Sequence, residues 1–214
     1  MNDDTPLRLA VKRGHVDAVK MLMDRGFTPL HLAVKRGHVD AVKMLMDRGD
    51  TPLFLAVKRG HVNSIKMLMD RGANINAETR DVCGTTLIHY AIENKEKLIA
   101  ELLSNHGANV NSSNDNGNTP LFLAVKRGHI DAVKMLIDRG SNVNAETWNG
   151  DTPLCLAVKN RHVNVVMMLL DRGANINSIP YKVYRDLYRG INGYESVAEI
   201  LTQHIVKMKT ANIY

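Results

Sequence analysis

The chain has 214 residues, of which 44% are hydrophobic and 23% are charged, and its formal net charge is +6. These values are ordinary for a soluble protein and do not separate an enzyme from a binding protein. The longest apolar stretch, residues 163–170, is too short to span a bilayer, and the N-terminus lacks the pattern of a cleaved secretion signal. With two cysteines, Cys83 and Cys155, in different repeats, neither a disulfide framework nor a zinc site is indicated.

An internal repeat dominates the sequence from its beginning. Residues 9–26 and 32–49 are identical, both reading LAVKRGHVDAVKMLMDRG. Related copies begin at positions 55, 90, 123 and 156, so that six copies account for most of the chain. Because a repeat array buries its core between neighbouring units, this pattern predicts a stack of units rather than one globular core.

Each unit carries the signals of two helices. A Thr-Pro pair or a close substitute starts the first helix, because threonine can cap a helix and proline fits its first position. In the first unit, Gly14 permits the left-handed backbone that ends this helix, and Gly26 ends the second helix. Asp17 and Arg25 match the dipole at the two ends of that second helix. The helix starts are Thr5, Thr28, Thr51, Thr86, Thr119 and Thr152.

Three short motifs resemble the ankyrin repeat: TPLHLA at residues 28–33, Gly-His at residues 37–38, and ANIN at residues 73–76. The resemblance covers about residues 5–178. It implies an all-α solenoid, a stack of antiparallel helix pairs with short β-hairpin fingers in the full-length repeats only. It also implies a function, because members of this family mostly bind other proteins through the fingertips and the inner face of the first helices.

The spacing of the helix starts departs from the usual period of about 33 residues. The starts at positions 5, 28 and 51 are closer together than those at 86, 119 and 152, and the missing residues correspond to the finger. We therefore expect fingers from about Gly72 onward and a stack without fingers over residues 4–49. The array, residues 1–179, is followed by a degenerate helical cap, residues 180–214, with helices expected at 180–187 and 194–208.

Two units depart from the repeat at the turn between their helices. Lys95 and Arg161 stand where the first unit has Gly14. A left-handed backbone costs a residue other than glycine about 1 kcal/mol, so this turn is either strained or rebuilt at both positions. We expect the units to differ in local stability for this reason.

The sequence does not indicate catalysis. Five of the nine histidines occupy one repeated place beside the inter-helix turn, where the resemblance implies a structural role. Corresponding residues of stacked helix pairs lie about 10 Å apart, too far to share one metal ion. No glycine-rich phosphate loop follows a strand, and no nucleophile-base set recurs, so we expect no enzyme, no cofactor and no metal. These histidines are His15, His38, His61, His129 and His162.

Lys-Arg pairs end several first helices, and stacking would align them in a basic ridge. Such a ridge could hold an acidic partner; alternatively, the cations are solvated and complement the helix carboxyl ends, at about 0.3–1 kcal/mol each. Glu93 interrupts the series. Regularly spaced cations could also bind nucleic acid, but the ridge lacks interleaved aromatics for stacking on bases. The ridge residues are Lys12, Arg13, Lys35, Arg36, Lys58, Arg59, Lys126 and Arg127.

The predicted fingers supply further candidates. Trp148, the single tryptophan, is either an anchor for a partner or packed against the neighbouring finger. Glu78, Arg80 and Asp115 lie near other fingertips and are candidates by analogy with the family.

These patterns favour a non-catalytic protein-protein interaction scaffold whose partner-binding residues are the ridge, Glu93 and the fingertip candidates. An alternative is a binder of nucleic acid or an acidic polymer through the basic ridge, and a third is a newly duplicated array with little function of its own. We expect a cytoplasmic monomer with an unidentified protein partner, whose surface can be acidic, and no membrane contact. The Asn-, Ile- and Lys-rich linkers lean toward an intracellular bacterium or a large virus, from which the protein could be delivered into a host cell.

Overall fold

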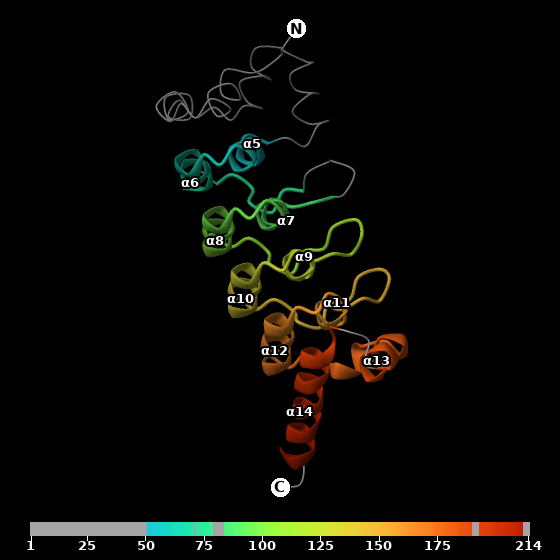
Figure 1. Cartoon of the computed structure of the whole chain (residues 1–214). Coiled ribbons are helices and arrows are strands. Elements are labelled where there is room, and N and C mark those ends of the chain that lie inside the picture. Colours follow the sequence, from blue (N-terminus) through green and yellow to red (C-terminus); the bar gives the residue numbers. More distant parts are fainter. Residues whose placement is uncertain (1–50, 71, 79–83, 190–192, 212–214) are drawn as a thin grey trace, which may run out of the picture. The chain divides into compact units, whose positions relative to one another are not determined.

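The computed structural model describes residues 51–70, 72–78, 84–189 and 193–211 (Figure 1). The chain divides into two compact units, Met1–Asn109 and Val110–Tyr214. The stack without fingers expected at residues 4–49 lies outside the described residues. Five of the candidate residues lie outside them too, namely Lys12, Arg13, Lys35, Arg36 and Arg80.

The described part of the first unit consists of two helix pairs. Helix α5 (Pro52–Lys58) packs against α6 (Val62–Asp70), and α7 (Leu87–Glu93) packs against α8 (Lys97–Asn105). The pairs stack through α5 and α7, where the rings of Phe54 and Tyr90 meet edge to face with centroids 5.4 Å apart. Leu53, Ile65 and Leu87 are buried in this core, so each pair supplies apolar cover for the other.

The second unit repeats the arrangement. Helix α9 (Pro120–Arg127) pairs with α10 (Ile130–Asp138), and α11 (Pro153–Lys159) pairs with α12 (Val163–Asp171). The first helices α9 and α11 pack against each other, as do the second helices α10 and α12. The described part of each unit therefore contains a stack of paired helices, as the repeat predicts, and no strand occurs among the residues that the structure describes.

Threonine caps start the first helices as expected. The Thr119 hydroxyl accepts a hydrogen bond from the Phe122 amide at 3.2 Å, and the Thr152 hydroxyl accepts one from Cys155 at 3.1 Å. At α7, where leucine replaces proline, Thr86 and His89 form a reciprocal capping box instead. The Thr86 amide donates to His89 Nδ1 at 3.2 Å. The side chain of His89 thus satisfies an amide that would otherwise lack a partner at the helix start.

The turn between the paired helices keeps its left-handed backbone even where glycine is absent. Gly128 has φ 67°, and Lys95 and Arg161 have φ 60° and 59°. Of the two outcomes expected at these positions, the strained turn is the one adopted. The cost is about 1–2 kcal/mol for each residue that has a Cβ atom.

The projecting loops are tighter than β-hairpins with paired strands. In the first unit, a single antiparallel bridge joins Glu78 to Thr86. In the loop before α9 the Asn114 amide donates to the Asn118 carbonyl at 3.0 Å, and in the loop before α11 the Thr147 amide donates to Asp151, also at 3.0 Å. The turn leaves too few residues for a ladder, so the described fingers are closed by isolated hydrogen bonds.

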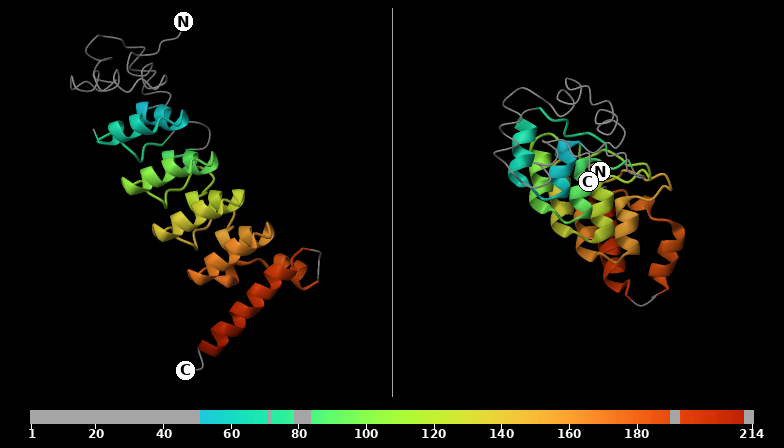
Figure 2. Two further views of the ribbon diagram at one scale, coloured as in Figure 1. Left: turned by 60° about the vertical axis from the view of Figure 1, so that its left-hand side comes forward. Right: turned by 90° about the horizontal axis from the view of Figure 1, so that it is seen from above.

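Two further helices follow the second unit's paired helices. After the short η1 (Ile176–Ser178) come α13 (Tyr181–Tyr188) and α14 (Glu195–Ala211), and α14 packs against both α12 and α13. Figures 1 and 2 show α14 inclined to α11 and α12 rather than parallel to them. Val197 and Leu201 are buried, whereas Val206 and Met208 nearer the C-terminus are exposed.

Candidate protein-binding surface

Asparagine side chains fix the position of each loop relative to the next. In the second unit, Asn111 Oδ1 accepts from the Asn142 amide at 2.7 Å, and Asn144 Oδ1 accepts from the Asn175 amide at 2.7 Å. Asn144 Nδ2 also donates to the carbonyl of Gly173 at 3.1 Å. The ANIN-type motif signalled the repeat, but its second asparagine also links consecutive loops, a role that the sequence analysis missed. The second asparagine recurs at the same place in each full-length repeat, and this recurrence was the signal in the sequence that could have indicated the role.

Trp148 lies on the loop before α11 and contacts the loop before α9. Its side chain is 75% exposed, yet its Nε1 donates a hydrogen bond to the backbone carbonyl of Asp115 at 2.9 Å. A Cβ atom on Gly117 would lie 2.7 Å from the Trp148 amide nitrogen and 3.1 Å from its Cγ. Trp148 and Asp115, two candidates from different loops, are thus brought together, and Trp148 is both packed on the neighbouring loop and open to solvent.

The carboxylates near these loops differ in how they are used. Asp151 is bound by Lys159, whose Nζ lies 2.7 Å from Asp151 Oδ1. This hydrogen bond raises the pKa of Lys159, while burial raises the pKa of the nearby Cys155 thiol. Asp115 and Glu146 are exposed, and their side chains form no ion pair or hydrogen bond with another residue that the structure describes.

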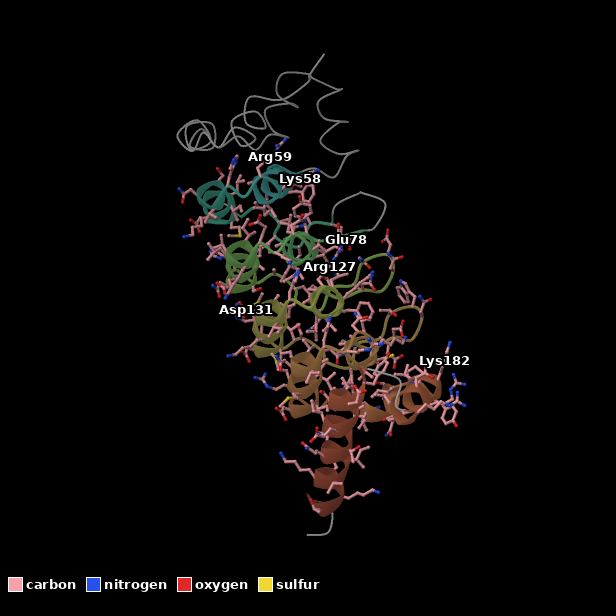
Figure 3. The ribbon with its side chains drawn as sticks, in the orientation of Figure 1. Lys58, Arg59, Glu78, Arg127, Asp131 and Lys182 are labelled. Carbon is pink, nitrogen blue, oxygen red and sulfur yellow. The ribbon has the colours of Figure 1, made fainter. Side chains whose placement is uncertain are left out.

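The described residues of the expected basic ridge are exposed at the ends of first helices, and Figure 3 labels three of them, Lys58, Arg59 and Arg127. Lys58 ends α5, where its Nζ lies 5.5 Å from the centroid of the Phe54 ring, and Arg59 follows it. Lys126 and Arg127 end α9. At the end of α11 the corresponding cation, Lys159, is held by Asp151 and is therefore less available to a partner.

Glu78 and Glu93 complete the described candidates. Glu78 is exposed and forms the bridge to Thr86, and Glu93, at the end of α7, is half-buried. Neither lies in the same compact unit as Trp148.

Those of the repeated histidines that the structure describes lie at the starts of second helices. His129 and His162 precede α10 and α12, and His162 Nδ1 lies 3.1 Å from the carbonyl oxygen of Val125 in the preceding repeat. The His162 ring also lies against Gly128, where a Cβ atom would be 3.1 Å away. His162 thus connects successive turns. Among the described residues, no group of three histidine, cysteine, aspartate or glutamate side chains is placed to hold a metal ion.

None of the helices in the described part of the chain has the length and apolarity to cross a membrane.

Comparison with known proteins identifies the repeat. A family model described as "Ankyrin repeats (3 copies)" matches residues 1–49, 46–114 and 101–180. Among curated proteins, a putative ankyrin repeat protein of fowlpox virus, FPV031, is 42% identical over 53 residues, which are 24% of this chain and 16% of that protein. A probable E3 ubiquitin-protein ligase of rice, XBOS34, is 43% identical over 63 residues, 29% of this chain and 12% of the ligase.

The rice potassium channel AKT1 is 41% identical over 58 residues, 27% of this chain and 6% of the channel. These matches span between 6% and 16% of the relatives' lengths, so the similarity concerns the repeats and not the whole proteins. The family model, in contrast, covers most of this chain, and the helix pairs, threonine caps and left-handed turns agree with it. The chain belongs to the ankyrin-repeat family.

Proposed function

We propose that this chain is a non-catalytic scaffold that binds a protein partner through its loop tips and the inner face of its first helices. Ankyrin repeats typically serve as protein-protein interaction modules, and the family match is to these repeats. The observation that carries the proposal is the tryptophan at a loop tip: Trp148 is 75% exposed while its Nε1 is hydrogen-bonded to the next loop. Tryptophan is the side chain most enriched among residues that dominate binding energy.

In this mechanism the loops present their side chains to the partner on a framework that is already ordered before binding. The side-chain oxygens of Asn111 and Asn144 hold consecutive loops by accepting hydrogen bonds from backbone amides, and Trp148 is fixed by its own bond to the Asp115 carbonyl. Ordering a flexible side chain at an interface costs about 0.5–1.5 kcal/mol, so a side chain that is already held binds with a smaller loss.

The alternative, binding of nucleic acid or an acidic polymer through the basic ridge, is supported by the exposed Lys126 and Arg127. The ion pair of Lys159 with Asp151 weakens this alternative, because the cation at the end of α11 is then less available to a polyanion. An array with little function of its own is the third candidate. We also propose that the protein is a monomer and acts in the cytoplasm, which light scattering and cell fractionation test.

Site-specific photo-crosslinking tests the proposal. A benzophenone amino acid is placed at position 148 and, as a matched control, at Met167, an exposed apolar residue of α12. Both chains are irradiated in lysate of the native cells, and the crosslinked proteins are identified by mass spectrometry. We expect one protein captured at position 148 and not at 167, displaced by excess unmodified chain.

Two results would contradict the scaffold. Equal capture at positions 148 and 167, or none at either, would favour an array without a specific partner. Capture that disappears after nuclease treatment, together with heparin binding that weakens steeply with added salt, would favour the alternative.

A further inference from the structure

The tips of two neighbouring loops in the second unit combine an open aromatic side chain with unused negative charge. We call Asp115, Glu146 and Trp148 the fingertip patch. The two loops lie side by side because Trp148 Nε1 is bonded to the Asp115 carbonyl, and in Figure 1 they project on the same side of the unit, before α9 and before α11. Glu146 is two residues before Trp148, and both are exposed while the intervening Thr147 is buried. Glu146 is therefore exposed near Trp148 on the same loop, and Asp115 lies on the loop to which the indole is bonded.

The indole is held, but most of its surface is uncovered. Its polar edge is satisfied by the Asp115 carbonyl, and its Cγ end rests close to the backbone of Gly117. What remains for a ligand is the π face, since the indole N–H is already used. A π face carries negative charge density and attracts cations placed over it, most strongly for tryptophan.

The charged residues of the two loops are all acidic. Asp115 and Glu146 form no ion pair or hydrogen bond through their side chains with other described residues, in contrast to Asp151, which Lys159 neutralises. The two loops, residues 110–118 and 141–151, contain no lysine, arginine or histidine. The patch is thus locally anionic on a chain whose formal net charge is +6.

We propose that the fingertip patch binds an arginine side chain of the protein partner. The planar guanidinium can stack on the indole and donate hydrogen bonds to Asp115 and Glu146 at the same time, which neither an aliphatic nor an acidic side chain can do. The inference rests on the proposed scaffold function and specifies the chemistry of its partner at this point. At this patch the partner side chain is basic, whereas the expectation of an acidic partner concerned the ridge.

The first experiment measures the local field directly, because Trp148 is the single tryptophan. Quenching of its fluorescence by caesium and by iodide is compared, each relative to free N-acetyltryptophanamide. We expect caesium to quench Trp148 more efficiently than iodide, although the net charge of the chain would give the opposite order. In the double variant Asp115→Asn, Glu146→Gln this preference should disappear. Stronger quenching by iodide in the unmodified chain would overturn the inference.

The second experiment measures binding with defined probes. Short fluorescein-labelled peptides of alternating serine and arginine, lysine, glutamine or glutamate are titrated with the full chain, and anisotropy is recorded. We expect the arginine peptide to bind most tightly. Trp148→Ala should weaken its binding by about tenfold and the double carboxyl variant by roughly three- to tenfold, whereas Trp148→Phe, which keeps a π face, should lose less.

A matched control separates the patch from general charge effects. The pair Asp171→Asn, Glu199→Gln removes the same charge from exposed positions on α12 and α14 and should leave binding unchanged. Equal weakening by both double variants, tighter binding of the glutamate peptide, binding of the lysine peptide as tight as that of the arginine peptide, or no binding of the arginine peptide would each refute the arginine assignment. None of these results bears on partner capture by crosslinking at position 148, so the scaffold can survive failure of this inference.

Discussion

The repeats formed by α7–α8 and by α11–α12 use the same left-handed turn without glycine, but they support it differently. Lys95, between α7 and α8, has φ 60°, is exposed, and its side chain makes no hydrogen bond or ion pair with other described residues. Arg161, between α11 and α12, has φ 59°, and its guanidinium lies 4.6 Å from the centroid of the Tyr194 ring. The same backbone strain is therefore uncompensated in one repeat and joined to a tertiary contact in the other.

The contact at Arg161 fastens the segment that leads into α14. Tyr194 also donates a hydrogen bond from its hydroxyl to the Lys159 carbonyl at 3.3 Å, at the end of α11. Gly193 has φ 96°, and a Cβ atom there would lie 3.2 Å from Arg161 Nη1. Glycine would fit the backbone at position 161 better, but the long arginine side chain makes the contact with Tyr194. A departure from the repeat therefore has to be judged by the contacts that the new side chain makes.

The same two repeats also differ at the fourth residue of the TPLH-type motif. His89 is fully buried and completes the capping box of α7, whereas Cys155 is fully buried in α11, where proline is present and the Thr152 hydroxyl accepts the Cys155 amide. The histidine performs a capping role that the cysteine cannot. Four predictions sharpen this comparison of the two repeats.

The largest effect is expected at His89. His89→Ala removes a buried side chain together with its bond to the Thr86 amide, and should lower the free energy of unfolding by about 3 kcal/mol. Cys155→Ala removes a single buried sulfur and should cost about 1 kcal/mol. Urea unfolding with local hydrogen exchange of α7 and α11 measures both. His89→Gln, which can still reach the Thr86 amide, should lose less than His89→Ala, and equal losses for the two would rule out the capping role.

Next in size is the contact of Tyr194. Tyr194→Ala removes the ring over Arg161 and the bond to Lys159, and should cost about 1–2 kcal/mol. Hydrogen exchange should become faster in α14 and at the end of α11, while α7 and α8 stay unchanged. Exchange of α14 at its original rate would mean that packing on α12 and α13 is sufficient to hold this helix.

A smaller effect, which differs between the two repeats, is expected from glycine at the turn. Lys95→Gly relieves the left-handed strain and should stabilise the chain by up to about 1 kcal/mol. Arg161→Gly relieves the same strain but loses the contact with Tyr194, so its net effect should be near zero or destabilising. Thermal or urea unfolding of both variants provides the measurement. Equal stabilisation by the two changes would show that Arg161 contributes nothing through its side chain.

The smallest effect concerns alkaline pH. Burial raises the pKa of the Cys155 thiol in the folded chain above its value in the unfolded chain. Its contribution to stability is therefore complete below the unfolded pKa, about 8.5, and is lost as the pH rises toward the folded value. The free energy of unfolding should fall more steeply above about pH 9 in the unmodified chain than in Cys155→Ala, which retains the ion pair of Lys159. Parallel pH profiles would contradict a buried, protonated thiol.

Much of the fold could be predicted from residues that act locally. The threonines before α9 and α11 cap the helices that they were expected to start, and the strained alternative at Lys95 and Arg161 was one of two stated outcomes. The β-hairpins were overestimated, because the loops close through one or two hydrogen bonds and form no ladder in the described residues. The capping role of His89 was missed, since it depends on a side chain filling in where proline is absent.

The candidate site was less predictable. Trp148 could be selected from its residue type and place in a loop, but its bond to the Asp115 carbonyl, 33 residues earlier, could not. The basic ridge was predicted from sequence spacing alone. The ion pair of Lys159 with Asp151 could not be predicted in this way, because it depends on side-chain geometry.

The sequence by itself determined the repeat, the paired helices and their ends, because these follow from periodic apolar residues and from caps within a few positions of each other. The tertiary structure alone decided which departures from the repeat are compensated. Arg161 meets Tyr194, and Trp148 meets the backbone of Asp115, only after the chain of the second unit has folded, since folding brings together residues about 33 positions apart whose pairing leaves no periodic signal in the sequence.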